Sequence, residues 1–133
     1  MEREDISDWE RRLKRLFDEI DDRLEDTYGP LFSLHPSRAR RGSTANKEHD
    51  GLFDVGASFS PGYGSSLGRG YVVDVDVVTL QAVPDRIREQ IEADVHRLIR
   101  ERLPDYFPGR DLRVGRDGNL IKIHGDLSFG SRR

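Results

Sequence analysis

Two aspartates, Asp74 and Asp76, lie two residues apart in a valine-rich run over residues 72–78. Residues two apart on a β-strand point to the same face of a sheet, so both carboxylates would face one way. Paired carboxylates can hold a divalent cation such as Mg²⁺ or Mn²⁺ for phosphoryl transfer, because hard cations take oxygen ligands. The alternative is a half-buried antiparallel strand with one solvated face and no cofactor. That alternative is favoured, because short acidic pairs are common in sequences.

A glycine-rich segment, residues 60–70, precedes these aspartates. Glycine permits close approach and positive φ, so backbone N–H groups of such a loop could bind phosphate or another anion. The residues that would do so are Gly64, Ser65, Gly68 and Arg69. The loop lacks the Gly-Lys-Ser/Thr ending of a P-loop. A long hairpin connection without a ligand is the competing interpretation.

The two features together carry a family resemblance, limited to residues 64–77. Gly64-Ser65 followed by Asp74-Val75-Asp76 resembles the glycine-serine and acidic-x-acidic elements of the nucleotidyltransferase superfamily. The resemblance implies a metal-dependent nucleotidyl- or phosphoryl-transfer enzyme in which Asp74 and Asp76 are catalytic and bind Mg²⁺ or Mn²⁺. The sequence departs from the family because its glycine-serine lies in a loop, not between a strand and a helix. No third carboxylate stands on an obvious neighbouring strand.

A basic cluster of Arg38, Arg40 and Arg41 lies in a segment without periodicity. Guanidinium groups suit phosphate or carboxylate partners, so the cluster is a candidate anion-binding or RNA-contacting arm, mobile until its partner binds. A second interpretation is that it folds back on the acidic end of the preceding helix. A third is a solvated linker, which is favoured for an isolated charge run.

The histidines offer weaker candidates for chemistry. His35, His49, His96 and His124 have no metal-ligand spacing. His124 is expected to lie across a hairpin from Asp111, and such a pair could act as an acid/base couple. A cross-strand surface pair is the favoured interpretation.

The clearest structural element is an amphipathic helix over residues 7–27, within an N-terminal segment 1–29. Its apolar residues recur at steps of three and four, on one stripe. We expect the stripe to be buried on the sheet or against a second copy, and its apolar excess favours an interface. The candidate interface residues are Trp9, Leu13, Leu16, Phe17 and Ile20.

The rest of the chain predicts four strands and a second helix. A basic irregular linker is expected over residues 30–51, an α+β core with the glycine-rich loop over 52–128, and a tail over 129–133. Strands are predicted on either side of the loop, then a helix opened by Pro84 and stopped by Pro104. The order α-β-β-α-β-β predicts an α+β two-layer sandwich, with two helices on one face of a mainly antiparallel four-stranded sheet.

The last two strands are predicted to form a hairpin. If Asp117-Gly118 is a two-residue type I′ turn, Val114 faces Ile121 and the aliphatic residues share one face.

Composition excludes several classes of protein. The chain has no cysteine, which excludes disulfides and thiolate metal sites, and its net charge is −3, unlike a strongly basic duplex-DNA-binding domain. No apolar run is long enough to span a bilayer and no secretory signal is evident, so we expect a cytoplasmic protein. The leading prediction is a small intracellular binding or interaction protein, non-enzymatic and in one version homo-oligomeric through its N-terminal helix. A protein or a second copy is the expected partner, nucleic acid is not favoured, and no membrane contact is expected.

Overall fold

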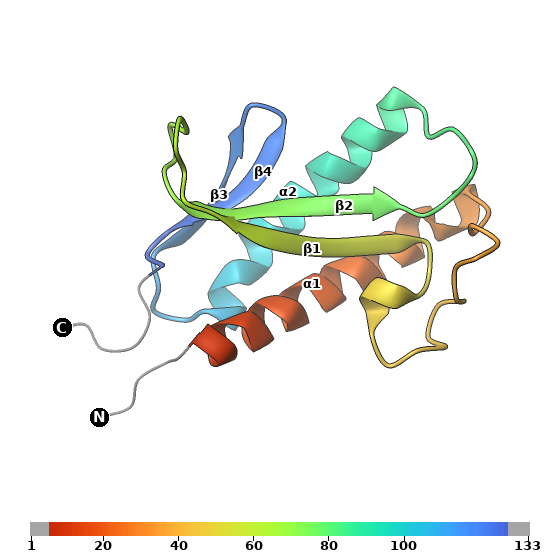
Figure 1. Ribbon diagram of the computed structural model, residues 1–133, viewed down its shortest axis with the longest axis horizontal. Helices are drawn as coiled ribbons and strands as arrows, with labels where there is room; N and C mark the ends of the chain where they lie inside the picture. Colours follow the sequence, from red (N-terminus) through yellow and green to blue (C-terminus); the bar gives the residue numbers. More distant parts are fainter. Residues whose placement is uncertain (1–5, 128–133) are drawn as a thin grey trace.

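The polypeptide folds into two α-helices and a four-stranded sheet, in the order predicted from the sequence (Figure 1). The structure is a computed structural model and describes residues 6–127. The tail predicted over 129–133 lies outside the described residues. The elements are α1 (Ile6–Tyr28), η1 (Gly29–Leu31), η2 (Lys47–His49), β1 (Phe53–Ser60), β2 (Gly70–Val77), α2 (Asp85–Tyr106), β3 (Leu112–Asp117) and β4 (Leu120–Gly125).

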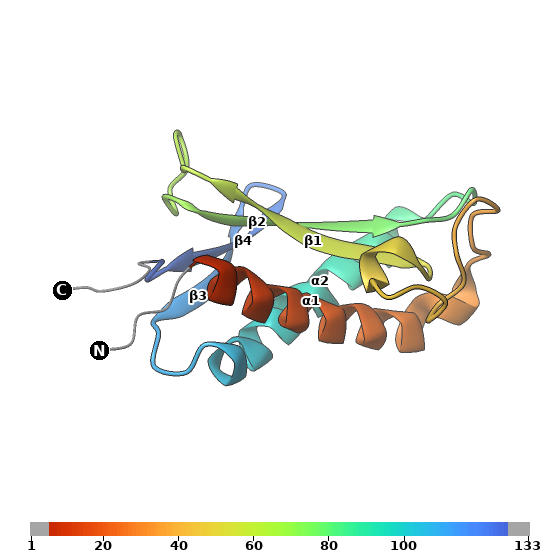
Figure 2. The ribbon, with the colours of Figure 1, turned by 60° about the horizontal axis from the view of Figure 1, so that its bottom comes forward.

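The sheet has the strand order β1-β2-β4-β3, and every neighbouring pair is antiparallel. Both helices pack on one face, which we call the helix face, and Figure 2 shows the resulting two layers. The opposite side of the sheet is called the open face. The prediction of an α+β two-layer sandwich is therefore confirmed. The order also makes β1 and β3 the two outer strands.

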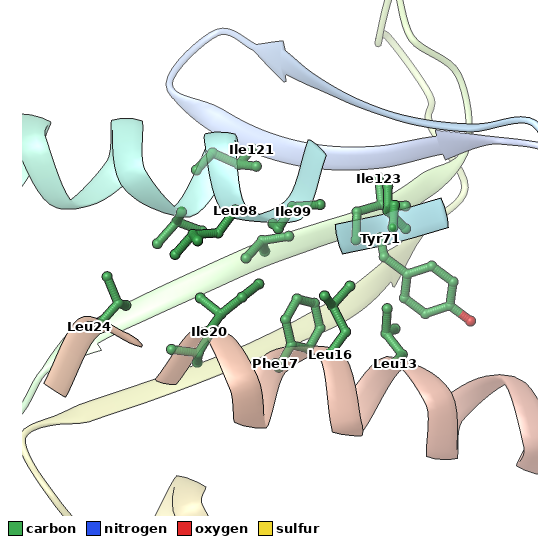
Figure 3. Close-up of a cluster of buried hydrophobic side chains, with 14 of the residues drawn as sticks. Leu13, Leu16, Phe17, Ile20, Leu24, Tyr71, Leu98, Ile99, Ile121 and Ile123 are labelled. Atoms are coloured by element: carbon green, nitrogen blue, oxygen red, sulfur yellow. The ribbon is translucent and has the colours of Figure 1, made fainter. Parts of the chain in front are cut away.

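The apolar stripe of α1 forms one half of the core. Its large side chains point at the sheet and at α2 (Figure 3), and each one buried contributes roughly 1.5–3 kcal/mol to folding. Trp9 is fully buried, and its ring centroid lies 4.4 Å from that of Phe107 and 5.7 Å from that of Tyr71. These contacts tie the start of α1 to the end of α2 and to β2.

Two details of the fold differ from the sequence prediction. Helix α2 does not stop at Pro104 but ends at Tyr106, with Pro104 inside its last turn. A proline there lacks one helical hydrogen bond, and few turns remain beyond it to be disrupted. The amide of Phe107 then closes the helix by donating to the carbonyl of Leu103 at 2.9 Å.

The β3-β4 hairpin has a register different from the predicted one. Asp117 pairs with Leu120, so the turn residues are Gly118 and Asn119, and Val114 faces Ile123. Gly118 has a φ of 65°, whereas no residue other than glycine has a positive φ among those described. That pattern belongs to a type II′ turn, which requires glycine first, and not to type I′. The register changed by two residues, so the aliphatic residues kept the helix face.

Neither helix within residues 6–127 combines the length and apolarity needed to cross a membrane.

Candidate interaction surface

The outer edge of β1 follows from the pairing of β1 with β2. The amide of Val78 donates to the carbonyl of Leu52 at 2.7 Å, which makes Leu52 and Val78 a hydrogen-bonded pair. Hydrogen-bonded and non-hydrogen-bonded pairs alternate along an antiparallel ladder. The even-numbered residues of β1 therefore bond to β2, while Val55, Ala57 and Phe59 direct their N–H and C=O groups away from the sheet.

The beginning of this edge is occupied by the chain itself. The outward amide of Phe53 donates to Glu25 at 3.0 Å, and its carbonyl accepts from Arg38 at 3.2 Å. Val55 is 2% exposed, and η2 contacts β1. These contacts close the edge as far as Val55.

Beyond Val55 the edge is open. Ala57 is half-buried and Phe59 is 53% exposed. No residue within 6–127 bonds to their outward N–H and C=O groups. We call this stretch, Ala57–Phe59, the open edge. It carries no charge, since residues 55–60 read Val-Gly-Ala-Ser-Phe-Ser.

A groove of about 200 Å³ runs between the open edge and α1. Its apolar lining consists of Leu13, Phe17, Ala57 and Tyr71, and its other lining residues are Glu10, Lys14, Glu48 and Gly56. We call it the edge groove. It lies on the helix face, the same side as the exposed ring of Phe59, whose centroid is 5.6 Å from that of Tyr71.

The predicted interface residues of α1 are already covered within one chain. Trp9, Leu13, Leu16, Phe17 and Ile20 are each at most 5% exposed. The sheet and α2 account for their burial, as the first of the two predicted alternatives requires. Leu13 and Phe17 nevertheless reach the surface region by lining the edge groove.

Asp74 and Asp76 lie exposed on the open face of β2. The register adds a third carboxylate, since Asp54 of β1 stands directly opposite Asp76. The strand for Asp54 was predicted, but its register to β2 was not. No group of three or more histidines, aspartates and glutamates in residues 6–127 has the arrangement to hold a metal ion.

The glycine-rich loop is folded onto the open face by a buried lysine, Lys122. This side chain, 1% exposed, donates to Ser65 Oγ at 3.0 Å, to the carbonyl of Gly68 at 2.8 Å and to Asp117 Oδ2 at 3.3 Å. All three protons of the ammonium are thereby used. We call this arrangement the lysine clamp.

The clamp depends on Gly70 and on the charge of Asp117. A Cβ on Gly70 would lie 2.4 Å from the carbonyl oxygen of Ile123 and 2.9 Å from Lys122 Cγ, so only glycine fits beside the lysine stem. The pKa of Asp117 is lowered by the hydroxyl of Ser65 and by Lys122, against the effect of burial. The loop therefore presents two oxygen acceptors, Ser65 Oγ and the carbonyl of Gly68, to the ammonium group of Lys122 in the same chain.

The predicted anion-binding residues fall in two places. Gly64 and Arg69 are exposed in the loop, which follows Ser60 at one end of β1, whereas the arginine cluster lies at the other end. Eight strand residues, roughly 25 Å, separate them. Figure 1 shows the loop and the 38–41 segment at opposite ends of β1. They do not form one site.

The arginine cluster mostly binds other parts of the chain. Arg38 donates to the carbonyls of Gly51, Asp50 and Phe53 at 3.0–3.2 Å.

Arg41 pairs with Asp22 at 3.2 Å and with Asp26 at 3.0 Å, both on α1. Arg40 is exposed and has no ion pair with a described residue. Arg41 therefore folds back on α1, as the second interpretation expects, whereas Arg38 binds the segment that leads into β1.

Two carboxylates of α1 are buried behind the start of β1. Glu25, 7% exposed, accepts from the amide of Phe53, and burial raises its pKa. Asp21 is 4% exposed, and its Oδ2 has no hydrogen-bond partner among residues 6–127. Burial, followed by the charges of Glu25 and Asp22, raises the pKa of Asp21 to about 8.

Two of the histidine candidates, His96 and His124, lie beside positive charges. His124 stands opposite Arg113, not opposite Asp111 as predicted, because of the changed hairpin register. Burial, then Arg113 and Lys122, lower its pKa. Burial, then Arg100 and Arg116, lower the pKa of His96. The Asp111–His124 couple is therefore not formed.

The open edge and the lysine clamp were both missed from the sequence. The signal for the edge was present in the charge-free run over residues 55–60, but its meaning depends on knowing that β1 is an outer strand. Lys122 gave no signal of its own, because a lysine between two isoleucines on a strand ordinarily faces solvent.

Comparison with known proteins places the chain in a family. A protein-family model described as "Uncharacterised protein" matches residues 4–125. A protein of Borreliella burgdorferi, named "Uncharacterized protein", is 37% identical over 120 residues, which cover 90% of this chain and 94% of that protein. No solved structure matches the chain at a significant level. Because the family model covers nearly all the described residues, the chain belongs to this family.

Proposed function

We propose that the protein is a non-enzymatic protein-interaction protein that binds an extended protein segment along the open edge of β1. The observation that carries the proposal is the combination of backbone groups at Ala57 and Phe59, which have no partner among residues 6–127, with an apolar groove beside them. An exposed sheet edge is a template for another strand. Binding by strand addition uses main-chain hydrogen bonds for affinity and side-chain pockets for specificity.

The geometry defines the chemistry of the bound segment. Side chains alternate between the two faces of a strand, so every second residue of an added strand would reach the helix face and the edge groove. Leu13, Phe17 and Tyr71 favour apolar side chains at those positions. Glu10, Lys14 and Glu48 offer polar contacts for the residues near them.

The contacts of the other candidates support this choice over the alternatives. The loop amides of Ser65 and Gly68, which could bind a phosphate, already donate to the carbonyls of Gly62 and Ser65 at 3.0 and 3.4 Å. Arg38 and Arg41 already bind backbone carbonyls and carboxylates of their own chain. A cytoplasmic location, in which the chain would meet other proteins, remains part of the proposal.

A selection of random peptides against the wild-type protein tests the proposal. We expect the selected peptides to have an apolar residue at every second position. Their binding should shift the amide NMR signals of Ala57 and Phe59. Phe59→Lys places a charge at the open edge and should weaken their binding by about tenfold or more, since tenfold is only about 1.4 kcal/mol.

Leu120→Lys is the matched control. Leu120 is 47% exposed, close to the 53% of Phe59, and belongs to β4, which β2 separates from β1. Peptides that bind both variants equally, or that shift amide signals elsewhere in the sheet, would contradict the proposed binding edge.

A further inference from the structure

We infer that the segment bound along the open edge is β1 of a second copy, so that two chains form one antiparallel eight-stranded sheet about a twofold axis at Ser58. This inference rests on the proposed function, since it names the partner of the same edge. It requires that the edge be complementary to itself. The backbone and the side chains of β1 each meet this requirement.

The backbone selects the position of the axis. Two antiparallel copies bond best when the outward residues face each other. With the axis at Ser58, Ala57 of each copy faces Phe59 of the other, and four otherwise unpaired N–H groups find carbonyls.

Neighbouring positions of the axis satisfy fewer groups. With the axis at Ala57, each Phe59 would face Val55, whose edge is already covered. With the axis at Phe59, each Ala57 would face Pro61, which has no N–H to donate. Ser58 is therefore the position that uses the open edge most fully.

The side chains agree with this register. Phe59 and the edge groove lie on the same face, and a twofold axis perpendicular to the sheet keeps that face common to both copies. Phe59 is 53% exposed in one chain. In the dimer each Phe59 would lie next to Ala57 of the other copy and near Leu13 and Phe17 of that same copy, which line its edge groove. No charged residue falls within the paired stretch, so no like charges meet directly across it.

A single cysteine tests the register, because the natural sequence has none. Residues facing each other in a non-hydrogen-bonded pair have Cα atoms about 4.5 Å apart, within the range of about 4.4–6.8 Å that a disulfide spans. Ser58→Cys should therefore give a disulfide-linked dimer on mild oxidation, in high yield at low protein concentration.

Ser60→Cys is the matched control, two residues along the same strand and on the same face. Its copy would lie four residues away along the strand, roughly 14 Å, beyond the reach of a disulfide. We expect at least a tenfold slower cross-link than for Ser58→Cys. Equal rates for the two variants, or no cross-link in either, would overturn the inferred register.

The mass in solution tests the assembly without a cysteine. Wild-type protein and Leu120→Lys should show twice the mass of one chain, while Phe59→Lys should dissociate at least tenfold more readily. A monomeric wild type that still binds selected peptides at the open edge would overturn this inference and leave the proposed function standing. A dimer that is insensitive to Phe59→Lys would overturn it as well, and failure of peptide binding in a monomer would remove both.

Discussion

The two outer strands of the sheet place their charges differently. β3 is six residues long and carries Arg113, Arg116 and Asp117. Charged residues on an edge strand discourage pairing with another strand. β1 is eight residues long, and its single charge, Asp54, lies at the end that η2 and α1 already cover. One edge is thus protected, and the other is open.

The buried ionisable groups near the two edges also differ. On the β1 side three carboxylates, Asp21, Glu25 and Asp50, are buried near the beginning of the strand, and residues 55–60 of the strand carry no charge. On the β3 side the buried ionisable group is Lys122, which fastens the β1-β2 loop over the open face of β3 and β4. The comparison teaches that uncharged sequence alone does not mark an interface. The absence of charge matters where the backbone is also unpaired.

The largest expected effect is on the β3 side. Lys122→Met keeps the volume of the side chain but leaves Asp117, Ser65 and the Gly68 carbonyl without their donor. Leaving buried acceptors without their donor costs about 1–3 kcal/mol, and hydrogen bonds from a charged group lie at the upper end of that range, so we expect a loss of about 3 kcal/mol. Urea denaturation measures this as a lower midpoint.

Arg113→Met is the control for the clamp, since Arg113 belongs to the same edge but its side chain is 67% exposed in its ion pair with Asp111. Exposed pairs contribute about 0–1 kcal/mol. If Lys122→Met lost no more stability than Arg113→Met, the clamp would not distinguish the β3 side.

The next effect concerns the buried carboxylates on the β1 side. The pKa of Asp21 is about 8 in the folded chain against 3.8 when exposed. Between these values the folded state holds a proton that the unfolded state has lost. Raising the pH therefore favours unfolding, by about 1.4 kcal/mol per pH unit for this group. We expect the free energy of unfolding to fall by about 2 kcal/mol between roughly pH 6 and pH 7.5.

Asp21→Asn removes the titrating group and should flatten this dependence. A smaller fall should remain, because burial also raises the pKa of Glu25. Denaturation midpoints measured across this pH range for both proteins make the comparison. Parallel curves would mean that Asp21 is ionised in the folded state.

Much of the fold was predictable, because periodicity reports the faces of helices and strands. The stripe of α1 and the order of elements needed only local patterns. The hairpin turn was misassigned by one residue because Asp-Gly and Gly-Asn are both turn sequences in Asp117-Gly118-Asn119, and only the backbone shows which pair forms the turn.

The candidate site was less predictable, because it is made by pairing between distant residues. The open edge exists because β4 pairs with β2, so that β1 becomes an outer strand. The position of Asp54 opposite Asp76 and the burial of Lys122 also depend on register across strands. No local pattern around Asp54 or Lys122 contains that information.

The smallest expected effect is on the open face between the two edges. A cation bound to Asp74 and Asp76 would stabilise the fold by about 2.7 kcal/mol at a hundredfold excess over its Kd, and would raise Tm by roughly 10 °C in a domain of this size. We expect millimolar Mg²⁺ or Mn²⁺ to change Tm by less than about 1 °C, well below that value. Thermal unfolding with and without each ion gives the answer.

Asparagine variants separate a solvated acidic face from a metal site. Asp54 and Asp76 face each other, and like charges directly opposite are destabilising, so Asp76→Asn should stabilise the fold by a few tenths of a kcal/mol, roughly 0.2–0.5. Asp74→Asn should change stability within about 0.5 kcal/mol, as exposed substitutions do. A metal-dependent rise in Tm that Asp74→Asn abolishes would instead favour the nucleotidyl-transfer alternative. The open face would then be a functional surface, and the difference between the edges of β1 and β3 would no longer be enough to locate the site of function.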